Sequence, residues 1–132
     1  MTRINADIDT SLLHRRHLVA ELREITMVPA ALKRSMRTKT KDDILKSIPK
    51  KFTLNTGHVR FFYDKQGFLM NRFMKLSMEM ERRGYEPDRL RVMAFVGFDK
   101  EFNNDWEASE EDNRLIQHRI RERIAQKPHL YT

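Results

Sequence analysis

The stretch that decides the fold is residues 64–84, DKQGFLMNRFMKLSMEMERRG, in which large apolar side chains recur every three or four positions. This spacing places them on one face of an α-helix, because a helix turns once every ~3.6 residues. Asp64 is a candidate N-cap, and Gly84 stands where a glycine commonly ends a helix. The stretch therefore predicts an amphipathic helix with a buried face. The residues on that face are Phe68, Leu69, Phe73, Leu76 and Met80.

Two more windows have helical spacing. In residues 10–37, apolar side chains step by three or four positions, and Pro29 is expected to kink or interrupt the helix. In residues 109–128, Ser109 and Asp112 have the spacing of a capping box. Acidic residues follow in the first turn and basic residues gather towards the end, as the helix dipole favours. The final proline of this window is expected to end the third helix.

The connections between these helices are long. Residues 33–51 hold eight basic and two acidic residues with weak periodicity, which is typical of an exposed connector. Residues 85–106 combine proline and glycine with an apolar patch, and this pattern leaves short helix, strand and ordered loop open. We therefore expect an all-α fold: a single compact domain over residues 1–132, with about three main helices and long connecting loops.

Composition narrows the classes of function. The chain has 132 residues, and its 26 Lys and Arg against 19 Asp and Glu give a net charge of +7, which favours polyanionic partners such as nucleic acid. The absence of cysteine excludes disulfides, thiolate catalysis and cysteine-ligated zinc, and it agrees with a cytosolic setting. No apolar run approaches the ~18 residues of a membrane span, and the start lacks a signal-peptide pattern. We expect no membrane association.

A polar seam borders the apolar face of the first helix. His14, His17, Glu21 and Glu24 fall within an arc of roughly 80°. A carboxylate in this position is partly desolvated, which suits proton transfer or the stabilisation of a cation, so Glu24 is a candidate. His14, His17 and Glu21 also have spacing compatible with a helical metal site, which leaves a metal-dependent nuclease open as an alternative. Solvated boundary residues are the third interpretation.

Several short motifs, taken together, are distinctive. They are Thr2-Arg3-Ile4-Asn5, His17, Ala20-Glu21, Arg23-Glu24, the run from Gly57 to Lys65, and the run from Ile124 to Pro128. With these motifs the chain resembles the phage pyrimidine-dimer DNA glycosylases, the ultraviolet-repair enzymes also called endonuclease V. The resemblance implies an all-α domain that removes a pyrimidine dimer and then cleaves the backbone as an abasic-site lyase. It implies double-stranded DNA with dimers or abasic sites as the partner, no cofactor or metal, a monomer, and the cytoplasm of a bacterium or phage-infected host.

The resemblance also implies the catalytic residues. The nucleophile is the α-amine of Thr2, exposed by removal of Met1, and the family's essential glutamate matches Glu24. An α-amine with a pKa of about 7.7 to 8.0 is roughly a third unprotonated at pH 7.5, so it can attack sugar C1′ without being buried. The imine then acts as an electron sink for β-elimination, while Glu24 stabilises positive charge on the sugar and moves protons.

Basic residues of the same motifs are expected to hold DNA. Arg3 and Arg23 match residues that grip DNA near the site, while Arg119 and Arg123 match phosphate-contacting residues of the last helix. The expected DNA-binding residues are Arg3, His17, Glu21, Arg23, Arg119 and Arg123.

The chain departs from the family pattern in two places. Residues 25–27 are Ile-Thr-Met where the family can carry Leu-Pro-Arg, which removes one phosphate contact. The aromatic and basic C-terminal tail is reduced to residues 129–132, of which Tyr131 remains. A non-catalytic DNA-binding module of the same fold is therefore the alternative function. His58 and the aromatic run at 61–63 are expected to be structural.

Overall fold

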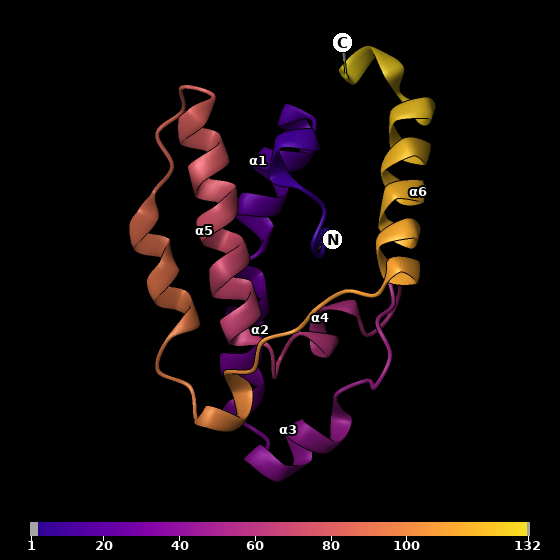
Figure 1. Cartoon of the computed structure of the whole chain (residues 1–132). Helices are drawn as coiled ribbons and strands as arrows, with labels where there is room; N and C mark the ends of the chain where they lie inside the picture. The colour runs from indigo at the N-terminus through magenta and orange to yellow at the C-terminus, as the bar shows by residue number, and fades with distance from the viewer. Residues whose placement is uncertain (1–2, 132) are drawn as a thin grey trace.

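The longest apolar stretch forms the central helix of the molecule. In a computed structural model, which describes residues 3–131, helix α5 (Gln66–Arg82) packs against α1 (Arg15–Glu24) and, on another side, against the 3₁₀ segment Arg89–Phe95. Figure 1 shows the N-terminal segment between α1 and the last helix, α6 (Glu110–Gln126). This arrangement places the two ends of the described chain beside α1.

The all-α prediction is confirmed, but the expected number of helices is wrong. Residues 3–131 contain six α-helices and four 3₁₀ helices, and they contain no β-strand apart from an isolated bridge. The extra helices arise because the long windows are divided and the connectors contain helices of their own. The helices not yet given are α2 (Met27–Met36), α3 (Lys41–Ser47), α4 (His58–Phe61) and the 3₁₀ helices Thr10–Leu12, Lys100–Phe102 and Pro128–Leu130.

The first window breaks earlier than predicted. Helix α1 ends at Glu24 and α2 begins at Met27, so the interruption lies before Pro29. Pro29 occupies the first turn of α2, where its missing N–H is tolerated because early helical N–H groups have no partner in the helix. Arg91 stabilises the break, because its Nη2 donates to the carbonyl of Arg23 and to Thr26 Oγ1.

The start of α5 also differs from the prediction. Its N-cap residue is Lys65, which makes no capping side-chain bond, and Asp64 does not cap the helix. The Asp64 carboxylate instead accepts from Lys65 Nζ at 2.7 Å, and its carbonyl accepts from the backbone and side-chain nitrogens of Asn104. The predicted end is correct, since Gly84 follows the helix with φ +94°.

The expected connector over residues 33–51 is partly helical. It contains α3, which begins after Thr40, whose hydroxyl accepts from the backbone N–H of Asp43. Ile44 anchors this helix in the core with 1% of its surface exposed. The segment 85–106, left open by the sequence, forms the 3₁₀ helices Arg89–Phe95 and Lys100–Phe102.

The third window is confirmed in detail. Ser109 and Asp112 form a reciprocal capping box, and α6 ends at Gln126, just before the proline that starts the last 3₁₀ helix. Only Ile116 of this helix is fully buried, Ile120 is partly buried against the core, and Arg119 donates to Asn5. Within residues 3–131, no helix has both the length and the apolar character required to cross a membrane.

Candidate active site

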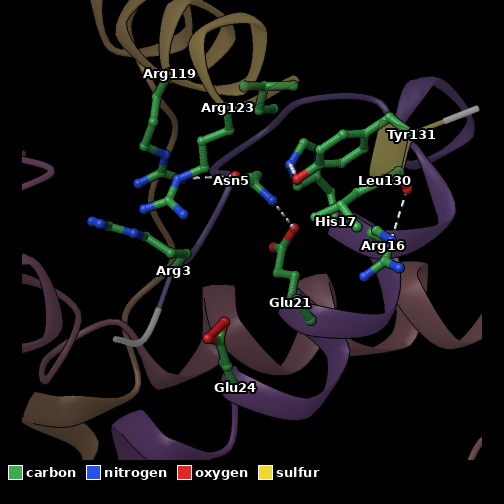
Figure 2. A pocket seen from close by; sticks show the side chains of 12 residues that line it. Arg3, Asn5, Arg16, His17, Glu21, Glu24, Arg119, Arg123, Leu130 and Tyr131 are labelled. Carbon is green, nitrogen blue, oxygen red and sulfur yellow. Dashed lines mark hydrogen bonds between the residues drawn. The ribbon is translucent and has the colours of Figure 1, made fainter. Parts of the chain in front are cut away.

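A cavity of about 300 Å³ lies between α1, α6 and the N-terminal segment. Figure 2 shows Glu21 and Glu24 on the α1 side, and arginines from the N-terminal segment and α6 on the other side. Most of the site residues expected from the sequence meet here. Those lining the cavity are Arg3, His17, Glu21, Glu24, Arg119 and Arg123, joined by Asn5, Arg16, Ala20, Ile120, Leu130 and Tyr131.

Among the described residues, one expected site residue, Arg23, does not line this cavity. Thr2 lies outside the described residues. Arg23 is exposed on α1 and borders a separate hollow that includes Arg15 and Val19. The separation follows from helix geometry, because consecutive residues on a helix lie ~100° apart, and so Arg23 and Glu24 point in different directions.

Glu21 is fixed in a buried ion pair that sequence reasoning missed. Its carboxylate accepts from Arg72 Nε at 2.8 Å and from Arg72 Nη2 at 3.0 Å, and both side chains are almost fully buried. Arg72 Nη1 also donates to the carbonyl of Ile8 at 2.6 Å. The sequence does indicate a buried partner for Arg72, because this residue falls inside the apolar arc of α5, where an unpaired charge is costly. Direct DNA contact by Glu21 stays a prediction, and its observed contacts are internal.

Asn5 links three parts of the site. Its Nδ2 donates to Glu21 Oε1 at 2.8 Å, and its Oδ1 accepts from Arg119 Nη2 at 2.9 Å. The side chain therefore joins the N-terminal segment to α1 and to α6. The sequence gives Asn5 only as part of a motif, because its partner on α6 is 114 residues away.

The carboxylate of Glu24 differs from that of Glu21 in its hydrogen bonding, although both residues lie on one face of α1. It is half-buried in the cavity wall, and among residues 3–131 no hydrogen-bond donor engages its carboxylate. Within the part of the chain that the structure describes, its oxygens are therefore unengaged, whereas those of Glu21 are held by Arg72. Burial lowers the pKa of Arg3, the positive charge of Arg123 adds to this shift, and the negative charge of Glu24 opposes it.

Three guanidinium groups form the opposite side of the cavity. Burial, reinforced by the positive charges of Arg3 and Arg123, lowers the pKa of Arg119 to about 10, so the group is still protonated near neutral pH. Arg3 Nε and Arg119 Nη1 are buried nitrogen atoms without a hydrogen-bond partner among the described residues. Arginines held close together with unused donors suit a phosphate, which accepts several charge-assisted hydrogen bonds.

The end of the described chain covers one side of the cavity. Arg16 Nε donates to the carbonyl of Leu130 at 2.7 Å, and Tyr131 Oη lies 3.2 Å from His17 Nε2 (Figure 2). Burial, and then the neighbouring His14, lowers the pKa of His17. His17 thus contacts Tyr131 and also lines the cavity.

The geometry does not support a metal site on α1. Both oxygens of Glu21 are held by Arg72, and His14 Nδ1 accepts from the backbone N–H of Arg16 as the N-cap of α1. No group of three potential His, Asp or Glu ligands converges within residues 3–131. The metal-dependent nuclease suggested by the residue spacing therefore has no ligand set in this part of the chain.

Comparison with models of known protein families gives an independent assignment. Residues 1–93 match the family described as pyrimidine dimer DNA glycosylase. The matched part includes the N-terminal segment and helices α1 to α5, and it leaves out α6, which supplies Arg119 and Arg123. Because the match extends over most of the chain and the resemblance of the sequence motifs agrees with it, this protein belongs to the pyrimidine dimer DNA glycosylase family.

Proposed function

We propose that the protein excises ultraviolet-induced cyclobutane pyrimidine dimers from duplex DNA and then cleaves the strand at the abasic site. The observation that carries the proposal is the position of Glu24. Its carboxylate, which no donor among residues 3–131 engages, lines the same cavity as Arg3. Arg3 follows the proposed nucleophile Thr2 in the sequence. The proposed reaction needs an acid and an amine nucleophile, and Glu24 supplies the acid.

The proposed reaction uses the neutral α-amine of Thr2 after removal of Met1. The amine nitrogen forms a bond to sugar C1′ as the N-glycosidic bond breaks and the base departs with its electron pair. Glu24 stabilises the positive charge that develops on the sugar and moves protons during ring opening. The C1′–O4′ bond then breaks, O4′ takes a proton from Glu24, and the amine nitrogen supplies the electron pair that completes the protonated imine between Thr2 and C1′.

Strand cleavage follows from the imine. Removal of a proton from sugar C2′ sends its electron pair towards the iminium, and the C3′–O bond breaks as the 3′ phosphate leaves. Water then hydrolyses the imine and restores the amine. A metal ion is not needed, because the protonated imine is the electron sink.

The arginines supply the grip on DNA. We place backbone phosphates against Arg3, Arg119 and Arg123, which line the cavity together. Arg3 and Arg119 each keep a donor nitrogen without a partner among the described residues, which supports this assignment. A lesion in a stacked duplex is reached by extruding a nucleotide, and the cavity of about 300 Å³ beside Glu24 is the proposed receptor for the extruded base opposite the lesion.

Borohydride trapping tests the proposal. Protein without Met1, as verified by mass, is incubated with a duplex that carries one cyclobutane thymine dimer and, separately, with a duplex that carries an abasic site. We expect a covalent adduct that maps to Thr2, little adduct for Glu24→Gln on the dimer, and none for protein that retains Met1. Glu111→Gln, an exposed change on α6, is the matched control.

The other outcomes distinguish the remaining interpretations. An adduct with the abasic duplex alone would support the lyase and refute dimer excision. No adduct with either duplex, together with salt-dependent DNA binding, would refute catalysis and favour the non-catalytic DNA-binding module.

A further inference from the structure

His58 lies deep in the molecule and contacts the N-terminal segment. It is the first residue of α4 and is 3% exposed. The rings of Phe52 and Phe62 enclose it, with centroids 5.6 and 5.3 Å from the imidazole. Burial of this kind prevents His58 from touching DNA, so any role in catalysis must act through its neighbours.

The two hydrogen bonds of His58 fix its tautomer. The backbone N–H of Ile4 donates to Nε2 at 3.0 Å, so Nε2 must be the acceptor nitrogen. Nδ1 lies 2.8 Å from the carbonyl of Thr53, which can only accept, so Nδ1 must carry the proton. The ring is thus a neutral imidazole that connects the loop before α4 to the main chain of Ile4.

The same loop holds the N-terminal segment at a second point. Arg3 Nη1 donates to the carbonyl of Leu54 at 2.8 Å, beside the carbonyl used by His58. Ile4 itself is completely buried. A slip of one residue in an extended segment moves the chain by ~3.3 Å, so these bonds fix the register of Arg3 and Ile4 against the loop before α4.

We infer that His58 is a positioning residue that sets the reach of the proposed nucleophile, the Thr2 amine, by holding the N–H of Ile4. The inference rests on the proposed function of Thr2. Its physical basis is proximity: a displacement of about 1 Å in a reacting group can cost ~10²-fold in rate. Binding of DNA depends on other groups, since the arginines that line the cavity do not bond to the imidazole.

The charge state of the ring agrees with this role. Burial lowers the pKa of His58 to about 4, the hydrogen bond to Thr53 opposes the shift, and the guanidinium of Arg119 adds to it. The acceptor nitrogen therefore remains unprotonated throughout the range in which an α-amine becomes nucleophilic, near its pKa of about 7.7 to 8.0.

Two substitutions of His58 separate its two hydrogen bonds. His58→Asn keeps an N–H close to the Nδ1 position for the Thr53 carbonyl but offers no acceptor to Ile4. His58→Gln extends an amide oxygen towards the Nε2 position, where it can accept from Ile4. His118→Asn, on the exposed side of α6, is the control for loss of a histidine.

The measurements separate chemistry from binding. Imine formation is followed in single turnover by borohydride trapping on an abasic duplex, and affinity is measured on a duplex with a tetrahydrofuran site, which cannot form an imine. We expect His58→Asn to trap about 10- to 100-fold more slowly with affinity within about twofold, and His58→Gln to recover most of the rate. Nitrogen NMR of the wild-type ring should show the proton on Nδ1.

Each other outcome has a definite meaning. If the wild type traps and His58→Asn traps equally fast, the positioning role is wrong while the proposed function stands. If rate and affinity fall together, His58 is merely structural and the inference is overturned. If His58→Asn does not fold, two other measurements still test the inference. It is refuted by a proton on Nε2 of the wild-type ring, or by failure of His58→Gln to form the adduct. Absence of any wild-type adduct refutes the proposed function itself.

Discussion

Removal of Arg72 should leave the Glu21 carboxylate buried without a cation. In Arg72→Met the carboxylate loses two hydrogen bonds and the carbonyl of Ile8 loses one. Met fills a similar volume, so the main effect is electrostatic. We therefore expect a large loss of folding stability from a substitution that leaves the apolar core intact.

The magnitude follows from the burial of the pair. Breaking a fully buried ion pair by removing one partner costs about 3–5 kcal/mol, a large part of the ~5–15 kcal/mol that stabilises a typical domain. Glu21→Met should cost a similar amount. In the double variant no charge is left alone, and only the Asn5 amide and the Ile8 carbonyl lose partners, at about 1 kcal/mol each. The double variant should thus be more stable than either single one.

The assay is equilibrium unfolding in urea at neutral pH, followed by fluorescence. The chain has one tryptophan, Trp106, which stacks on Phe52 with centroids 5.6 Å apart and therefore reports on the core. Arg114→Met is the matched control, because it breaks an exposed pair with Glu110 and should change stability by less than ~1 kcal/mol.

The comparison of single and double variants decides the outcome. Strong coupling, with the double variant more stable than Arg72→Met, supports a buried and mutually dependent pair. If the two single losses simply add in the double variant, the two side chains do not stabilise one another and the reasoning is wrong.

Three further predictions rest on other parts of the structure. Burial lowers the pKa of His58 to about 4, so the folded state favours the neutral ring. The free energy of unfolding, complete above pH 6.5, should therefore fall by roughly 3 kcal/mol as the pH drops to ~4. Urea unfolding across this range should show the loss for the wild type and not for His58→Gln. Gly67→Ala should lower the free energy of unfolding by about 1–2 kcal/mol, because the alanine Cβ would lie 2.8 Å from the carbonyl oxygen of Asn103. This clash should outweigh a helix propensity gain of ~1 kcal/mol. A raised urea midpoint would contradict the prediction. Arg123→Gln should weaken binding to undamaged duplex and reduce the slope of log K against log salt concentration by about 1. Arg121→Gln, on the opposite side of α6, should change both quantities less. Equal effects of the two variants in a salt titration would argue against the cavity as the phosphate site.

Local signals in the sequence predicted the helices that local interactions define. The apolar face of α5 follows from side-chain period, and the start of α6 follows from a capping box completed within four residues. The break after Glu24 was missed because Arg91, a residue 65 positions from Thr26, stabilises it. Helix α3 had a usable signal in Thr40 and Asp43, which dense basic charge obscured.

The candidate site was predictable only in part for the same reason. Helical spacing placed Glu21 and Glu24 on one seam, and family resemblance selected Glu24 as the acid. Spacing could not show which carboxylate would be neutralised, because Arg72 is 51 residues from Glu21. The linking role of Asn5 could not be predicted either, because its two partners, Glu21 and Arg119, are 16 and 114 residues away.

The bond between Asn5 and Arg119 has a consequence for the order of events during synthesis. These residues are 114 positions apart, so at about 5–20 residues per second the ribosome needs on the order of ten seconds to make the second after the first. During that interval the nascent chain has one wall of the cavity and lacks the other. An unfinished polypeptide therefore has no complete cavity with which to act on the genome, and its competence begins only when the last helix is released.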